Sequence, residues 1–126
     1  MLADRRAHTT LPTLDVERLR RWYEDILGFT PFAERPGAVI YRTATGSLFA
    51  LSRAGSPSSG TTTQMAFTVD DIDAEVADLR ARGVIFEMYA TPETIEGIAT
   101  IGPGRAAWFK DPDGNLLAVI QFHDPV

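Results

Sequence analysis

Few side chains in this sequence could do chemistry. The 126 residues include two histidines, His8 and His123, and no cysteine. An imidazole can bind a metal ion or transfer a proton near neutral pH, so His8, in a Thr-rich segment before Asp15, is the first candidate. His123 lies near the C-terminus, where we expect it to be solvated. The lack of cysteine excludes disulfide and thiolate chemistry, and no residue is identified as catalytic.

The sequence lacks the motifs of several other functional classes. It has no glycine-rich phosphate loop, no nucleophilic triad and no basic patch. Twelve Lys and Arg residues stand against 17 Asp and Glu residues, a net charge of −5 that argues against a nucleic-acid partner. No apolar run is long enough to span a bilayer, and the N-terminus lacks a secretory apolar region. We therefore expect a cytoplasmic protein without a membrane partner.

The elements that must position these residues follow from the hydrophobic pattern. Asp15 is a candidate N-cap for a helix over 15–27, which carries an apolar stripe and ends at Gly28. Alternation and turn signals predict strands over 8–14, 29–35, 38–42 and 47–53. Residues 54–63, which read AGSPSSGTTT, have the composition of a flexible linker.

The pattern then starts again. A second helix is predicted over 71–82, with Ile72, Val76 and Leu79 facing inward. Residues 91–104 read as a loop, and residues 111–115 as a tight turn. Strands are predicted over 64–69, 84–89, 105–110 and 116–122.

The two halves are an internal repeat. Their beginnings match at an offset of 56, which places His8 on Gln64, and their ends match at an offset of 68, which places Ala50 on Ala118. Each half is too small to bury much surface alone, so the second is its natural partner. We predict an α+β fold of two βαβββ modules, 8–53 and 64–122, joined by linker 54–63 into one domain. Its eight strands would form an open curved sheet with a trough for a small ligand.

Four segments carry a resemblance to a known family. They are HTTLPTLD from His8, WYEDILGF from Trp22, QMAFTVDD from Gln64 and WFKDPDGNL from Trp108. Together they resemble the vicinal oxygen chelate superfamily, which includes glyoxalases, bleomycin-resistance proteins and extradiol dioxygenases. The resemblance covers nearly the whole chain and implies the paired-module fold, but it does not determine which of the family's activities is present.

The resemblance also implies where a metal would lie. Metal-dependent relatives place one ligand on the first and last strand of each module, and those positions are His8, Ala50, Gln64 and Ala118. Alanine cannot coordinate a metal, and one histidine with one amide is too few protein ligands for tight binding. We therefore predict no metal and no cofactor. His8 has three interpretations: a ligand contact, a partly buried histidine hydrogen-bonded at a strand start, or an inherited residue without function. Gln64 either contacts the ligand or is an amide bonded to backbone or water.

The predicted trough has a small and mostly apolar lining. Every second residue along the strands should face it, which adds Thr10, Ser52 and Thr68 to the candidate ligand contacts. Trp108 is a further candidate, but strand parity alone does not decide whether Trp108 or Phe109 faces the trough. Such a lining suits a flat organic molecule better than a phosphate.

The leading hypothesis is a metal-free small-molecule-binding protein that sequesters an antibiotic or a metabolite. The alternative is a glyoxalase-like lyase, isomerase or dioxygenase with an atypical site, or an acid–base catalyst that uses His8. A third reading is a non-catalytic module whose trough is filled by its own side chains. We also predict a homodimer, because small sheets leave unpaired edges.

Overall fold

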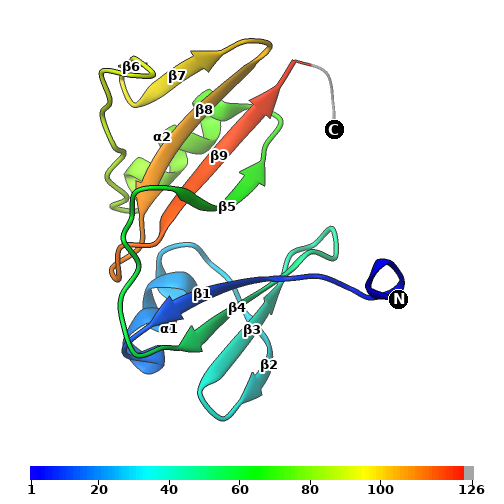
Figure 1. The fold of residues 1–126 in the computed structure, drawn as a ribbon. Coiled ribbons are helices and arrows are strands. Elements are labelled where there is room, and N and C mark those ends of the chain that lie inside the picture. The colour runs from blue at the N-terminus through cyan, green and yellow to red at the C-terminus, as the bar shows by residue number, and fades with distance from the viewer. Residues whose placement is uncertain (124–126) are drawn as a thin grey trace. The chain divides into compact units, whose positions relative to one another are not determined.

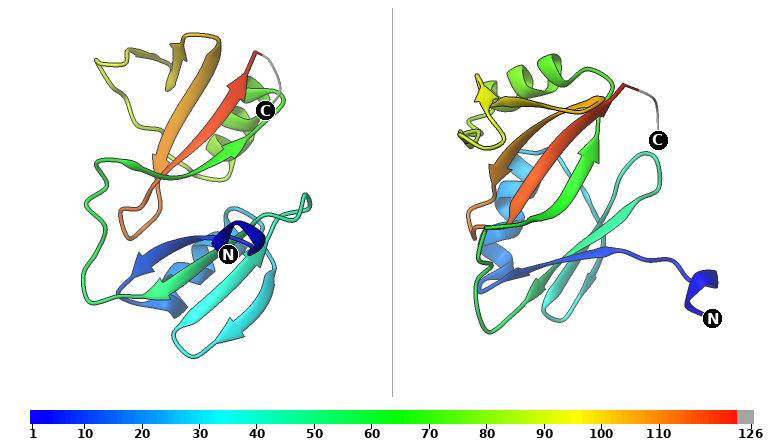
Figure 2. Two further views of the ribbon diagram at one scale, coloured as in Figure 1. Left: turned by 45° about the vertical axis from the view of Figure 1, so that its right-hand side comes forward. Right: turned by 45° about the horizontal axis from the view of Figure 1, so that its top comes forward.

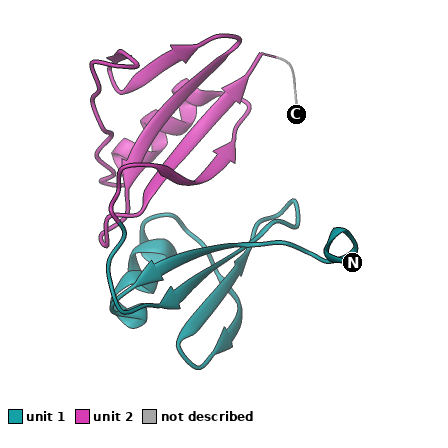
Figure 3. Ribbon diagram, in the orientation of Figure 1, with its two compact units in different colours: residues 1–58 teal, residues 59–126 magenta. Residues whose placement is uncertain are grey.

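The computed structural model describes residues 1–123, which fall into two compact units. The chain divides between Ser58 and Ser59, inside the predicted linker 54–63 (Figure 3). Unit 1 contains a short 3-10 helix, Leu2–Asp4, followed by β1 (Thr9–Thr13), α1 (Val16–Asp25), β2 (Pro31–Arg35), β3 (Ala38–Arg42) and β4 (Leu48–Arg53). Unit 2 contains β5 (Thr63–Thr68), α2 (Ile72–Ala81), β6 (Thr94–Ile95), β7 (Ile98–Ile101), β8 (Gly104–Lys110) and β9 (Leu116–Phe122) (Figure 1).

In unit 1, α1 packs on one face of a four-stranded sheet with the order β1-β4-β3-β2 (Figure 2). Strand β1 runs parallel to β4, and the other neighbours are antiparallel. Tyr23 of α1 is fully buried and contacts the rings of Tyr41 and Phe49 from β3 and β4. These aromatic contacts form the core and fix which face of the sheet is covered by the helix.

Unit 2 repeats this design with a five-stranded sheet in the order β5-β9-β8-β7-β6. Ile72, Val76 and Leu79 of α2 are buried, as the helical spacing predicts. The side chain of Gln121 on β9 accepts a hydrogen bond from the backbone N–H of Ile72 at 2.9 Å, which fastens the start of α2 to the sheet. Among residues 1–123, no helix is long and apolar enough to cross a membrane.

The strand registers confirm the internal repeat. Thr10 pairs with Ala50 in unit 1, and Ala66 pairs with Ala118 in unit 2. The first strands therefore correspond at the offset of 56 and the last strands at the offset of 68. Asp15 and Asp71 cap the two helices in the same way, because each accepts a hydrogen bond from the backbone N–H three residues later. The fold is α+β, with two βαβββ-like modules.

The region after α2 differs from the prediction. The expected strand over 84–89 is an extended segment that joins the sheet through an isolated bridge between Phe86 and Phe109. The expected loop over 91–104 instead contains β6 and β7, and β7 pairs with β8 through a turn at Gly102. The described residues therefore contain nine strands in two sheets, not eight in one. Three of the four residues 98–101 are β-branched, but their pairing depends on the partner strand β8.

An ion pair connects α2 to the sheet and predicts a pH dependence of stability. Both terminal nitrogens of Arg105 donate to the carboxylate of Asp73 at 2.9 Å, and this hydrogen bonding lowers the pKa of Asp73 below its ordinary value. A depressed carboxylate pKa contributes stability above the ordinary pKa, and this contribution is lost as the pH falls through the folded-state pKa. We expect the unfolding free energies of the wild type and Asp73→Asn to differ near neutral pH and to converge in strong acid. Urea denaturation at a series of pH values measures this difference, and a constant difference would contradict the assignment.

Candidate functional site

Six of the eight predicted site residues lie on the sheet faces that the helices do not cover. In unit 1, Phe49 and Leu51 pack toward α1, so Ala50 between them points to the opposite face. Thr10 pairs with Ala50, and Ser52 lies two residues further along β4, so all three side chains lie on that face. Ala50 is buried, Ser52 is half-buried and Thr10 is exposed.

Unit 2 has the corresponding arrangement. Ala118 on β9 lies between Ala66 on β5 and Trp108 on β8, and these cross-strand neighbours share the helix-free face. Thr68 lies two residues beyond Ala66 on the same strand and on the same face. The register with Ala118 settles the orientation of Trp108, because Phe109 points to the helix side and is 1% exposed.

The four positions that metal-dependent relatives use do not fit a metal here. Ala50 and Ala118 end in methyl groups, which have no donor atoms. His8 is exposed, precedes β1, and makes no hydrogen bond with the rest of residues 1–123. Within that described range, no group of three or more His, Cys, Asp or Glu side chains is arranged to hold a metal ion.

The Gln64 amide is engaged within unit 2. Its nitrogen donates to the side-chain oxygen of Asn115 at 3.0 Å, and its oxygen accepts from the backbone N–H of Leu116 at 3.1 Å. Asn115 is fully buried and donates in turn to a carboxylate oxygen of Asp111 at 2.7 Å. This network fastens β5 to the turn between β8 and β9. That Gln64 contacts a ligand stays a prediction, and such a contact would compete with these bonds.

A cavity in unit 2 is lined by Trp108. It has a volume of about 440 Å³, within the range of pockets that hold small organic ligands. The indole ring of Trp108 meets the ring of Tyr89 edge-to-face, with 5.6 Å between the ring centroids. The indole N–H donates to the hydroxyl of Thr63 at 3.1 Å, so its polar atom is satisfied and its apolar face is available. The full lining is Gly60, Thr61, Thr63, Glu87, Tyr89, Thr91, Pro92, Trp108, Lys110 and Leu116.

Polar groups border this aromatic surface. The Tyr89 hydroxyl makes no hydrogen bond with the other described residues, so it can donate one to a ligand. Burial, and then the neighbouring charge of Glu87, raise the pKa of Tyr89, which keeps the phenol protonated at neutral pH. The carboxylate of Glu87 pairs with Lys110 at 3.4 Å. The cavity therefore combines an apolar aromatic wall with a phenolic donor and one neutralised charge pair.

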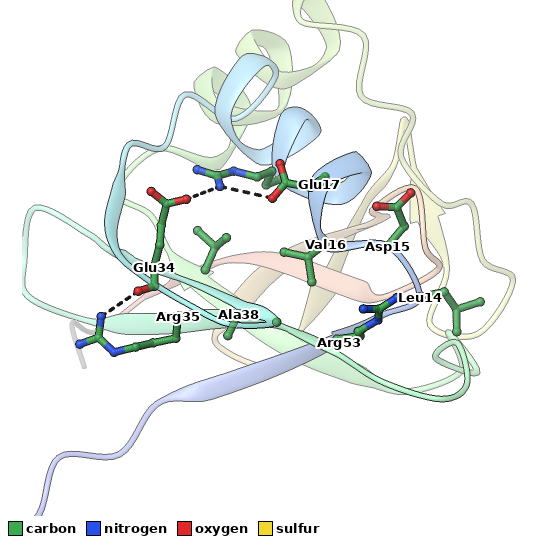
Figure 4. Close-up of a pocket in the computed structure, with 11 residues that line it drawn as sticks. Leu14, Asp15, Val16, Glu17, Glu34, Arg35, Ala38 and Arg53 are labelled. Carbon is green, nitrogen blue, oxygen red and sulfur yellow. Dashed lines mark hydrogen bonds and ion pairs between the residues drawn. The ribbon is translucent and has the colours of Figure 1, made fainter.

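A second cavity, of about 470 Å³, lies in unit 1 between the start of α1 and the β2–β3 hairpin (Figure 4). Its charged groups mainly bind one another, because Arg20 forms ion pairs with Glu17, Glu34 and Glu24. The Tyr41 hydroxyl donates a hydrogen bond to Glu24 at 2.8 Å. Burial, together with this bond, raises the pKa of Tyr41. These pairs connect the helix to the hairpin, and none of the predicted site residues lines the cavity.

Of the residues that line this cavity, Trp108 is predicted from the sequence as a candidate ligand contact, and Tyr89 and Thr63 are not. Tyr89 was assigned to a regular strand, whereas it lies in the extended segment that runs beside β8. Thr63 was assigned to the linker, whereas it begins β5. An irregularity in the β5–β9 register falls between Thr63 and Met65, beside the residue that bonds Trp108. The aromatic character of Tyr89 was the only sequence signal for its role.

Comparisons with known proteins agree with this architecture. The model of the Glyoxalase/Bleomycin resistance protein/Dioxygenase superfamily matches residues 5–119. Virulence protein STM3117 of Salmonella typhimurium (strain LT2) is 25% identical over 129 residues, covering 97% of this chain and 87% of the relative.

Two solved structures are similar over most of their length. TnmS3, an antibiotic binding protein from Streptomyces sp. CB03234, matches with 24% identity and a TM-score of 0.68 over 94% of this chain and 98% of its own. The fosfomycin resistance protein FosX of Listeria monocytogenes matches with 19% identity and a TM-score of 0.69 over 94% and 93%. At these identities the two structures establish a shared fold.

Proposed function

Because the chain belongs to the glyoxalase/bleomycin resistance protein/dioxygenase superfamily, we propose that it binds a flat, largely apolar organic molecule without a metal and sequesters it. The observation that carries this proposal is the cavity in which Trp108 and Tyr89 present an aromatic wall. Because the indole N–H is already bonded to Thr63, the energy of binding would come from covering the ring face. Burial of apolar surface contributes about 25 cal/mol per Å².

The two alanines support binding rather than metal-assisted catalysis. Ala50 and Ala118 occupy positions where metal-dependent relatives carry ligands, and a methyl group can only add apolar contact area there. The antibiotic-binding relative TnmS3 shows that the fold can serve such a role, so we propose an antibiotic or a metabolite as the ligand. His8 and the hydroxyl groups of Thr10, Ser52 and Thr68 are proposed as additional polar contacts.

The test compares the two tryptophans of the chain. A thermal-shift screen of flat aromatic compounds, with and without divalent metals, would identify ligands of the wild type. We expect Trp108→Ala to weaken the binding of these compounds by at least about tenfold, which corresponds to about 1.4 kcal/mol. The matched variant Trp22→Phe, on α1 of unit 1, should bind them as the wild type does.

Two results would overturn the proposal. One is compound binding that is equally strong in Trp108→Ala and the wild type. The other is a stoichiometric metal that co-purifies and whose removal abolishes an activity, which would favour a lyase, isomerase or dioxygenase instead.

We also propose that the protein is a cytoplasmic homodimer. The exposed outer strands of the two sheets support this, because β1, β2, β5 and β6 each have an edge without a strand partner in their sheets. Light scattering at micromolar concentration tests the assembly, and a monomeric mass would contradict it.

A further inference from the structure

The segment Ser59–Thr63, which we name the strap, begins unit 2 and lies against the turn between β8 and β9. Gly60 has a φ of +69°, and a methyl group at this position would lie 2.8 Å from the carbonyl oxygen of Gly114. The same methyl would lie 3.2 Å from the Cε atom of Lys110. A non-glycine residue would meet both a strained backbone conformation and a backbone clash, so Gly60 determines how closely the strap approaches the β8–β9 turn.

The strap also forms one wall of the Trp108 cavity. Gly60, Thr61 and Thr63 line that cavity, and Thr63 accepts the hydrogen bond from the indole N–H. The hydroxyl groups of Ser59 and Thr61 hydrogen-bond to each other at 2.9 Å, which keeps this part of the strap compact. Lifting the strap would therefore remove a wall of the cavity and release the tryptophan ring.

We propose that Gly60 and Thr63 are positioning residues of the ligand site, and that filling the Trp108 cavity holds the strap against the β8–β9 turn. This inference rests on the function proposed above. Its physical basis is that the strap is short, rich in small polar residues and exposed at Ser59, Thr61 and Thr62. The strap contacts the rest of unit 2 at Gly60 and Thr63, so a ligand that touches its inner side between these residues would stabilise the closed position. Ligand binding would thereby order the stretch of chain that leads to unit 1.

The chain contains no cysteine, so a single introduced thiol can report on the strap. We would place it at the exposed Thr62 as Thr62→Cys, in a Trp22→Phe background where Trp108 is the only tryptophan. The rate of thiol modification by Ellman's reagent measures strap opening, and proflavine, a flat three-ring amine, serves as the probe ligand. We expect saturating proflavine to slow modification several-fold, and to have no effect on the rate in Trp108→Ala.

Two glycines of the linker provide a matched comparison. Gly60→Ala should raise the modification rate, shift the Trp108 emission to longer wavelength and weaken proflavine binding. Gly55→Ala should change none of these, because Gly55 has no atom within 4 Å of an added methyl and no positive φ. A Thr63→Val variant, which keeps the shape but loses the acceptor, should alter the Trp108 emission, while Thr63→Ser should restore it.

The outcomes separate this inference from the proposed function. If proflavine binds at Trp108 but leaves the thiol rate unchanged, the strap inference is wrong and the binding function stands. If proflavine does not bind, the comparison of Gly60→Ala with Gly55→Ala still tests whether Gly60 positions the strap. A faster thiol rate and a shifted emission in Gly60→Ala alone would support the inference, and identical behaviour of the two variants would overturn it.

Discussion

Replacing Asn115 by alanine is expected to lower the free energy of unfolding by about 2–4 kcal/mol. The Asn115 side chain is fully buried, receives a hydrogen bond from the Gln64 amide and donates one to Asp111. Alanine would leave both partners without this bond in a buried region, and an unsatisfied buried polar group costs more than an average hydrogen bond gains. Urea denaturation monitored by tryptophan fluorescence measures the loss.

The control for this prediction is Glu93→Ala, at an exposed residue whose side chain makes no hydrogen bond or ion pair with the other described residues. This variant should change the stability by less than about 0.5 kcal/mol. Gln64→Ala should produce a loss comparable to that of Asn115→Ala, because it removes the same link between β5 and the turn. A double variant that costs much less than the sum of the two single variants would confirm the coupling. An Asn115→Ala variant as stable as Glu93→Ala would show that the network contributes nothing.

The helices were predictable because their signals are local. Asp15 and Asp71 act as N-caps, and the 3.6-residue spacing correctly placed Ile72, Val76 and Leu79 in the core. In α1, Leu19 and Tyr23 of the apolar stripe are the buried residues. The internal repeat was also predictable. Several segments of the two halves match at the same two offsets, and this agreement is informative even though each single motif is weak.

The hairpin of β6 and β7 was not predictable in the same way. Its residues lie among Pro92, Gly97, Gly102 and Pro103, so composition favoured a loop. What makes 98–101 a strand is its pairing with β8, a tertiary contact that local propensity does not encode. Local propensity also misleads over residues 84–89. Their sequence favours a strand, but the segment joins the sheet only through an isolated bridge at Phe86.

Within the candidate site, sequence reasoning could name residue types but not their partners. Strand parity left Trp108 and Phe109 as alternatives, and the register with Ala118 decides between them. Gln64 occupies a ligand position of the family pattern, yet its amide bonds Asn115, 51 residues away in the chain. Tyr89 could not be connected with Trp108, because their contact depends on the extended segment beside β8.

These differences bear on the function. The family pattern directs attention to four positions, of which two are alanine and one, Gln64, is engaged in a structural network. The aromatic cavity at Trp108 is built from residues outside the metal pattern. These observations support the proposal that the cavity holds a molecule rather than polarises one.

The turn between β6 and β7 offers a pair of substitutions with opposite expected effects. Glu96 and Gly97 both have positive φ values, +52° and +82°, as a two-residue hairpin of this type requires. A methyl group at Gly97 would lie 2.9 Å from a guanidinium nitrogen of Arg80 and 3.0 Å from the Cβ atom of Phe86. Gly97→Ala therefore combines backbone strain with crowding, and we expect it to lower the free energy of unfolding by about 2–3 kcal/mol.

Glu96→Asn should have the opposite effect, because asparagine tolerates the left-handed conformation better and Asn-Gly is a favoured sequence for this turn. We expect a gain of about 0.5–1 kcal/mol. Gly102→Ala is the matched control, since Gly102 also has a positive φ but has no atom within 4 Å of an added methyl. Gly102→Ala should lower the free energy of unfolding by about 1 kcal/mol, which is the cost of the backbone strain alone. Urea denaturation of the three variants under identical conditions makes the comparison. If Gly97→Ala costs no more than Gly102→Ala, the contact with Arg80 and Phe86 does not constrain this turn.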